Sequence, residues 1–226
     1  MEHVLDNPAY NALNTGNANL ANGNEQIKYF SKEVSPFIGF KENLPDNFKQ
    51  LHVLVPHGGP VGFVSPVETT IPAIWHVLHS VPCFQMVYTG DIVPMEDTDL
   101  IALTHDDIPQ MLELTKLTNP GPFASRTIDF GHYRGIFDGD KLVAMAGQRM
   151  NPLPYAEVSA VCTHPDYTGR GYAKQLLQYH CNRIIAEGYV PFLHVRCDNA
   201  RAIKVYENMG FETRTKMYFY ILKKSV

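Results

Sequence analysis

The sequence is poor in the residues on which disulfide scaffolds and metal centres depend. It has four cysteines among 226 residues, and no two of them have C-x-x-C spacing: Cys83, Cys162, Cys181 and Cys197. Disulfide frameworks and structural zinc sites need suitably spaced cysteines, so we expect these four to be reduced core thiols. His76 and His79 have the spacing of one helix face, yet no acidic or cysteine partner follows at ligand spacing. The sequence therefore predicts no metal site.

Long apolar runs and basic clusters are also lacking. No stretch approaches the length of a membrane span, and the first residues do not show the basic-then-apolar pattern of a signal peptide. The formal net charge is −4, and Lys223–Lys224 is a short basic pair where nucleic-acid binding needs a cluster. With 45% hydrophobic residues, the chain can bury a core. We expect a cytoplasmic globular protein whose partners include neither membranes nor nucleic acid.

One segment present in the sequence has the pattern of an anion-binding turn. Residues 156–163 alternate as a strand does, Pro165 ends the strand, and apolar positions from Ala173 to Ile185 follow helical spacing. Gly169 and Gly171 therefore lie at the N-terminus of the predicted helix. Free backbone N–H groups and the positive end of the helix dipole meet there, which favours a phosphate-bearing ligand. Such glycines also make ordinary strand-to-helix turns, so a second motif is needed.

The second motif follows the apolar run from Tyr189 to Val195. It has the pattern N-x-x-A-x-x-x-Y-x-x-x-G-F, from Asn199 through Tyr206 to Gly210 and Phe211. Asn199 is a predicted N-cap and Gly210 a C-terminal stop, so the motif predicts a short helix after a strand.

Together the two motifs resemble those of the GNAT superfamily of acyl-CoA-dependent N-acyltransferases. The family's phosphate-binding turn, called the cradle below, is usually written Q/R-x-x-G-x-G/A. Here the cradle reads Thr168, Gly169, Arg170, Gly171, Tyr172, Ala173. Thr168 departs from the pattern, which affects one side-chain contact but none of the backbone donors. The resemblance covers residues 97–226. It implies an α/β (α+β) fold, with a mixed, mostly antiparallel twisted sheet flanked by helices, and acetyl-CoA as co-substrate.

The polar stretch 94–99 predicts a boundary between two units. Residues 97–226 form the predicted catalytic GNAT domain, with the order β, α, β, β, β, α, β, α, β. Its first helix is capped by Thr104 and Asp107, and its hairpin turns at Asp138-Gly139-Asp140. Residues 1–96 form a predicted smaller α/β domain, interpreted as a degenerate GNAT-like copy. Strands are expected there at 26–30, 36–40, 50–55 and 84–89, and a helix near 71–80.

Two residues are candidates for the acid–base chemistry of acyl transfer. Glu157 lies on the strand that leads into the cradle, at the offset of a catalytic glutamate in several family members, and is the candidate general base. Period-two alternation predicts that it shares a face with Val161 and Thr163. Tyr206 matches the family's general acid, which protonates the departing thiolate. The alternative interpretations are a glutamate on a solvated face and an aromatic that packs a helix.

The resemblance also implies a set of binding residues. Val161 and Thr163 would pair with the pantetheine arm, Asn199 would contact it, and the cradle would hold the pyrophosphate through Gly169, Arg170, Gly171, Tyr172, Ala173 and Lys174. Phe123 and Arg126 lie in the segment that crosses the acceptor side, where Arg126 either binds a substrate carboxylate or is simply solvated. His194 is interpreted as a core histidine.

The predicted activity is acetyl transfer to a primary amine, small or peptidic, by direct attack in a ternary complex. Cys162 offers a covalent route, but alternation places its side chain on the face opposite Glu157. Two alternatives stay open. One is a CoA-binding regulatory module without catalysis, and the other is transfer of longer acyl groups to amino acids. The sequence does not identify the acceptor or the oligomeric state.

Overall fold

The computed structural model describes residues 3–56, 58–95 and 100–225. Within them the strands form one eleven-stranded sheet, in the order β1-β2-β3-β4-β11-β5-β10-β9-β8-β7-β6. The strands are β1 Ala21–Gly23, β2 Ile27–Phe30, β3 Phe37–Phe40, β4 Val61–Ser65, β5 Trp75–Tyr88, β6 Ile101–Ala102, β7 Arg134–Asp138, β8 Lys141–Gln148, β9 Tyr155–Thr163, β10 Val190–Arg196 and β11 Phe211–Lys224. Only β3–β4 and β9–β10 pair in parallel among the described strands. The predicted mixed, mostly antiparallel sheet is confirmed.

Helices cover both faces of this sheet, because each strand buries alternate side chains on opposite sides. The α-helices are α1 Pro8–Asn14, α2 Pro45–Leu54, α3 Ile108–Thr118, α4 Tyr172–Ala186 and α5 Ala200–Asn208. One core cluster joins α1 and α3 to the sheet, through residues such as Leu13 and Met111. The other face packs against α4 and α5 at one end and against α2 at the other.

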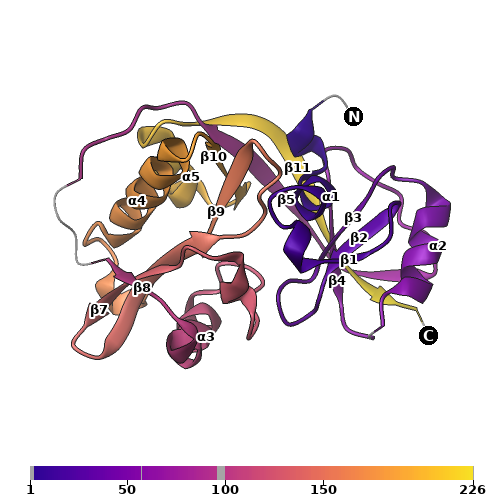
Figure 1. The fold of residues 1–226 in the computed structure, drawn as a ribbon, viewed down its shortest axis with the longest axis horizontal. Helices are drawn as coiled ribbons and strands as arrows, with labels where there is room; N and C mark the ends of the chain where they lie inside the picture. The colour runs from indigo at the N-terminus through magenta and orange to yellow at the C-terminus, as the bar shows by residue number, and fades with distance from the viewer. Residues whose placement is uncertain (1–2, 57, 96–99, 226) are drawn as a thin grey trace.

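Two long strands run through the whole molecule. Figure 1 shows β5 and β11 crossing from the side that carries α4 and α5 to the side that carries α2. β11 pairs with β5 along its length and with β4 over Tyr218–Leu222, while β5 pairs with β10 beyond Cys83. The predicted boundary between residues 96 and 97 lies outside the described residues. A strand from the predicted N-terminal domain therefore stands between two strands of the predicted catalytic one.

The order of elements from β6 to β11 agrees with the sequence prediction, including the Thr104–Asp107 capping box and the turn at Gly139, where φ is +58°. Two predictions in the N-terminal half are wrong. The run 50–55, expected as a strand, lies mostly in α2, which begins at Pro45 and buries Phe48 and Leu51 one turn apart. The segment 71–80, expected as a helix around Trp75, contains the start of β5, which β11 holds in its ladder.

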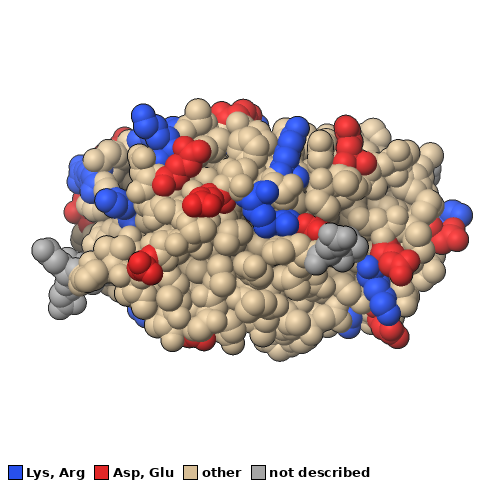
Figure 2. All heavy atoms as spheres, turned by 90° about the horizontal axis from the view of Figure 1, so that it is seen from above, with Lys and Arg blue, Asp and Glu red and all other residues tan. Residues whose placement is uncertain are grey.

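The charged side chains on the surface are dispersed. On the face shown in Figure 2, Lys and Arg lie singly or beside Asp and Glu, without a continuous field of one sign. None of the helices in the described part of the chain is long and apolar enough to cross a membrane.

Candidate active site

The cradle at the start of α4 is open toward an incoming anion. Gly169 and Gly171 have φ of +83° and +82°, a left-handed conformation that disfavours side chains. Gly171 is the N-cap of α4, and no side chain caps the helix there. A Cβ built on either glycine would meet nothing within 4 Å. The first N–H groups of α4 are thus left for a ligand, as the motif predicts, and the residues fit a pyrophosphate.

A β-bulge interrupts β9 just before the cradle. Met145 pairs with Cys162 and Gly147 with Ser159, so two residues of β9 lie opposite Ala146 alone. Ala160, the first of the two, has a positive φ of +53°. The neighbouring strand β10 pairs with β9 only as far as Glu157. Beyond that point the strands separate, and β9 offers an unpaired edge beside the cradle to which an extended ligand arm could add.

The bulge changes which side chains share a face. Val161 packs in the α4 clusters, as Val158 does, whereas Cys162 packs in the α3 cluster on the other face. Glu157 lies on the face opposite Val158, so it shares its face with Cys162. The prediction that Glu157 lies with Val161 and Thr163, and opposite Cys162, is therefore wrong. Strict alternation fails because the extra residue shifts the parity of the strand by one.

Glu157 is fully buried and surrounded by donors. Arg149 donates from Nε to Oε2 at 2.9 Å and from Nη2 to Oε1 at 2.5 Å. The Met150 N–H donates to Oε2 at 3.2 Å, and Nδ1 of His194 lies 2.7 Å from Oε1. Burial alone raises the pKa of Glu157, but the charge of Arg149 and the hydrogen bonds from Arg149 and His194 outweigh it and lower the pKa to about 2.

A chain of polar side chains continues from Glu157 across the sheet. Gln85 on β5 lies with Nε2 at 3.0 Å from Nε2 of His194, and Nε of Arg214 on β11 donates to Gln85 Oε1 at 2.6 Å. An amide nitrogen can only donate, so Nε2 of His194 accepts and its Nδ1–H points at Glu157. Burial lowers the pKa of His194, which favours this neutral ring. Arg214 ends the chain on Asp6.

Tyr206 and Asn199 both lie on or next to α5. Burial raises the pKa of Tyr206 to about 12, and its ring packs edge-on against Phe211 at 5.9 Å between centroids. No acceptor for its hydroxyl is present among the described residues, so the proton is available to a ligand. Asn199 caps α5, as predicted, with Oδ1 accepting from the Ala202 N–H at 3.1 Å. Its amide nitrogen takes no part in that cap.

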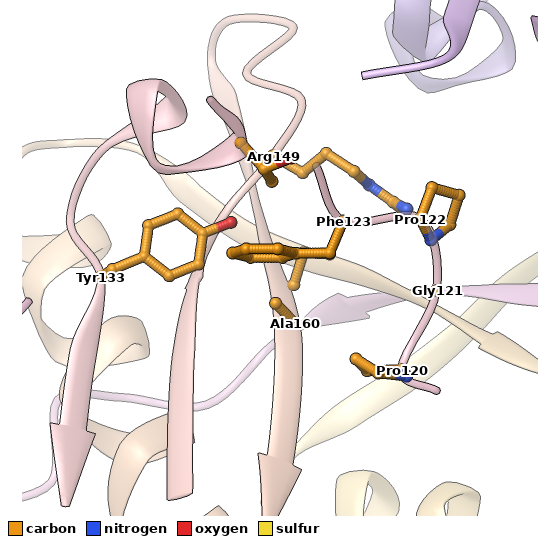
Figure 3. A pocket seen from close by; sticks show the side chains of 9 residues that line it. Pro120, Gly121, Pro122, Phe123, Tyr133, Arg149 and Ala160 are labelled. Atoms are coloured by element: carbon orange, nitrogen blue, oxygen red, sulfur yellow. The ribbon is translucent and has the colours of Figure 1, made fainter. Parts of the chain in front are cut away.

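A small pocket opens beside the bulge, on the face that carries α3. It encloses about 10 Å³, roughly the room of one water molecule, and widens from there into open solvent. Nine residues line it: Pro120, Gly121, Pro122, Phe123, Thr127, Tyr133, Arg149, Ser159 and Ala160. In Figure 3 the Phe123 ring lies between Tyr133 and the loop, and the Arg149 side chain extends toward Pro122. Phe123 thus lines the pocket, and its contact with an acceptor stays a prediction.

Arg126 does not line this pocket. Its side chain is 57% exposed, and it pairs with Asp129 at 2.7 Å. The backbone here has a fixed position, because the Arg126 N–H donates to the Glu33 carbonyl at 2.8 Å and Thr127 Oγ1 donates to the Val34 carbonyl at 2.7 Å. The N-terminal half thereby anchors the loop that forms the pocket.

Sequence reasoning missed Arg149, and it set His194 aside as a core residue. A signal for Arg149 was available. Antiparallel β8 and β9 are joined by a short loop, and continuing the pair Gln148–Val158 by one residue brings Arg149 opposite Glu157. An arginine and a glutamate facing each other at the end of two buried strands indicate an ion pair.

A helix N-terminus without a side-chain cap, an unpaired strand edge and a pocket follow one another along this part of the chain. The profile of the FR47-like protein family matches residues 133–220. A putative GNAT-family acetyltransferase from Novosphingobium aromaticivorans is 33% identical, with 100% of both chains covered and a TM-score of 0.92. The chain belongs to the GNAT family of acetyltransferases.

Two curated relatives are also similar. The N-alpha-acetyltransferase RimI of Mycobacterium tuberculosis is 38% identical over 85 residues, which are 36% of this chain and 52% of that protein. The ribosomal protein bS18 alanine N-acetyltransferase of Salmonella typhimurium is 28% identical over 119 residues, or 50% of this chain and 80% of that protein. The chain thus spans about half the length of the mycobacterial relative. Both names agree with the predicted acetyltransferase class.

Proposed function

We propose that this chain is an acetyl-CoA-dependent N-acetyltransferase that acylates a primary amine by direct attack in a ternary complex. The observation that carries the proposal is the juxtaposition at the end of β9. The bulge at Ala160, the unpaired strand edge and the uncapped α4 N-terminus follow one another between residues 158 and 172, and the bulge lines a pocket of mixed polarity. Acetyl-CoA supplies the activated acetyl group as a thioester.

The cradle residues 169–174 would bind the pyrophosphate through backbone N–H groups. The edge of β9 at Val161 and Thr163 would pair with the pantetheine arm. Oγ1 of Thr163 is buried without a hydrogen-bond partner in the described structure, and such an orphan is expected where a ligand completes a site. The Asn199 amide nitrogen, not used by its helix cap, would donate to the same arm.

Tyr206 is the proposed general acid. Its raised pKa of about 12 keeps the phenol protonated at neutral pH, so a proton is available for the departing thiolate. Glu157 is a weak proton acceptor, because its pKa is about 2 and its oxygens are already bound by four donor groups. We propose that Glu157 positions Arg149, and that water in the open pocket takes the proton from the amine.

Direct attack is favoured over a covalent route. The Cys162 thiol is buried, and burial raises its pKa to about 11, although a hydrogen bond from Thr118 opposes the shift. A thiol with that pKa is almost entirely protonated at neutral pH and is a poor nucleophile.

The test is CoA thiol release from acetyl-CoA in the presence of pooled amines, measured against an amine-free control. Amine-dependent release is the expected result. Saturable acetyl-CoA binding without release from any pool would support the non-catalytic CoA-binding module instead. Faster release from longer acyl-CoAs than from acetyl-CoA would support the longer-chain alternative.

A further inference from the structure

The acceptor pocket holds a single charge. Of the nine residues that line it, Arg149 alone is ionic, and the walls are otherwise prolines, aromatic rings, small residues and hydroxyls. The Arg149 side chain is 11% exposed, so most of its guanidinium is shielded from bulk water while one part of it reaches the pocket. A charge held this way interacts strongly with any ion that enters the pocket, because few water molecules screen it.

The pairing with Glu157 occupies only two of the N–H groups of the Arg149 guanidinium. An arginine has five N–H groups in a rigid plane, and two of them point at Glu157. Among the described residues no acceptor meets the other three. The Arg149 Cζ atom lies over the Phe37 ring, 4.9 Å from its centre, in a cation–π contact that helps to fix the guanidinium. The free N–H groups thus form a fork of fixed orientation, the geometry that binds a carboxylate in bidentate fashion.

Glu157 is the counter-ion of Arg149, but it does not itself line the pocket. Its own charge is shared with the His194 Nδ1–H and the Met150 N–H, besides the two Arg149 groups. Neither of these two partners lines the pocket. The site therefore presents donors and a positive charge to a ligand, and presents no carboxylate.

We propose that Arg149 binds a carboxylate of the acceptor, and that the acceptor is a free α-amino acid; this inference rests on the proposed N-acetyl transfer. The bulge residue Ala160 lines the same small pocket as Arg149, and the proposed acetyl-CoA arm follows the next residues of β9, so an acceptor whose amine reaches the thioester there would need its carboxylate close to that amine. An α-amino acid has that arrangement. A peptide N-terminus has a neutral amide in place of the carboxylate, and the Arg149 fork would then meet no charge. Pro122 and Phe123 favour an apolar side chain.

The test compares three acceptors that differ at one position: leucine, leucinamide and 3-methylbutylamine. Amine-dependent CoA release with acetyl-CoA should give leucine a kcat/KM about 10- to 100-fold above either analogue, the range expected for hydrogen bonds to a charged group. Leucinamide has the less basic amine, so amine protonation alone would favour it over leucine. Equal rates for leucine and leucinamide, or a preference for a leucine-initiated peptide, would overturn the inference while leaving the acetyltransferase proposal intact. No release from these three acceptors, with release from the pooled amines, would overturn the inference alone, and no release from any amine would overturn both.

Two matched variants test whether Arg149 causes the preference for leucine over leucinamide. Arg149→Lys keeps the charge but lacks the planar fork, and it should reduce the preference for leucine over leucinamide to within about threefold, mainly through KM. Arg126→Lys makes the same change on the neighbouring loop and should retain the preference. Loss of the preference in Arg126→Lys alone would place the carboxylate there instead and overturn the role of Arg149.

Binding gives a readout independent of turnover. Titration calorimetry with the product N-acetylleucine should detect tighter binding than with N-acetylleucinamide in the wild type. The difference should disappear in Arg149→Lys. Equal binding of the two products to the wild type would contradict the proposal, and this measurement needs no variant to fold.

Discussion

Nδ1 of His194 lies 2.7 Å from Oε1 of Glu157, and the two residues come from adjacent parallel strands at the point where these strands separate. This contact closes the polar chain that begins at Arg149 and ends at Asp6. Its ionic groups are paired with one another, Arg149 with Glu157 and Arg214 with Asp6, so removal of either carboxylate leaves an arginine without its counter-ion.

Glu157→Gln should therefore lower the free energy of unfolding at pH 7 by about 3–5 kcal/mol, because Arg149 loses its counter-ion. In the wild type the folded pKa of about 2 lies below 4.5, the ordinary value for a glutamate in an unfolded chain. The unfolded chain then binds more protons in this window, so stability is present above pH 4.5 and is lost as the pH falls toward 2. Urea titrations at several pH values should find this acid-dependent loss in the wild type and a reduced one in the variant. Glu25→Gln, at an exposed pair with Lys41, is the control and should change stability by less than about 1 kcal/mol.

Tyr206→Phe should lower kcat by about 10²- to 10⁴-fold, the usual effect of losing a general acid. The hydroxyl makes no hydrogen bond with a described residue, so the melting temperature and the KM for acetyl-CoA should stay close to those of the wild type. Steady-state kinetics with any accepted amine measures both parameters. A kcat within threefold of the wild type would mean that another group protonates the thiolate.

Gly171→Ala should weaken acetyl-CoA binding beyond its cost in stability. The left-handed φ of +82° makes any side chain unfavourable by about 1–2 kcal/mol, and the new methyl group would occupy the space in which the pyrophosphate is expected. Gly139→Ala is the matched control, since Gly139 also has a positive φ, +58°, and open space around it, but lies in the β7–β8 turn. Both variants should lose stability, whereas only Gly171→Ala should raise the Kd for acetyl-CoA in calorimetry. Equal Kd values would argue against the cradle.

Cys162→Ala should keep turnover within about threefold of the wild type. The thiol shares a face with Glu157, yet its pKa of about 11 leaves little thiolate at neutral pH. The comparison needs rates at saturating substrate together with a melting curve. Lost turnover at an unchanged melting temperature would indicate an acyl-cysteine.

His180→Leu should make stability less sensitive to acid. Burial, with the Arg183 charge nearby, lowers the pKa of His180 from 6.5 to about 3. Below pH 6.5 the unfolded chain binds the proton more readily than the folded protein, so the neutral buried ring destabilises the fold progressively down to pH 3. Between pH 7 and 5 this effect amounts to about 2 kcal/mol, and the variant should lack it in urea titrations. His79→Leu, at an exposed position, should retain the wild-type slope.

The parts of the fold that the sequence predicted correctly depend on local rules. The α4 N-terminus follows from Gly169 and Gly171, the cap of α5 from Asn199, and the β7–β8 hairpin from Gly139. In each case one residue type satisfies a backbone requirement within a few positions. Such signals do not depend on what packs nearby.

The sequence predictions that are wrong concern segments whose structure is determined by contacts with residues distant in the chain. Residues 50–55 have a strand-like composition but pack as a helix against the aromatic cluster around Phe63, and Trp75 begins a strand because β11 supplies its hydrogen bonds. The bulge at Ala160 has no glycine to mark it, so alternation put Cys162 on the wrong face. Arg149 was missed because its importance comes from Glu157 and the pocket loop together. Sequence patterns describe neighbours along the chain, and these features involve neighbours across the sheet.

The central position of β11 also affects how the protein is made. Of the described elements it is the last to be synthesised, yet it lies between β4 and β5, which are made much earlier. Until it arrives, both of those strands have an unpaired edge, and nascent chains with open edges tend to associate with one another. The pocket loop depends on the same N-terminal half through Glu33 and Val34. A ribosome stalled before residue 211 would therefore hold an aggregation-prone intermediate, and protection of the growing chain by a chaperone would matter most in that interval.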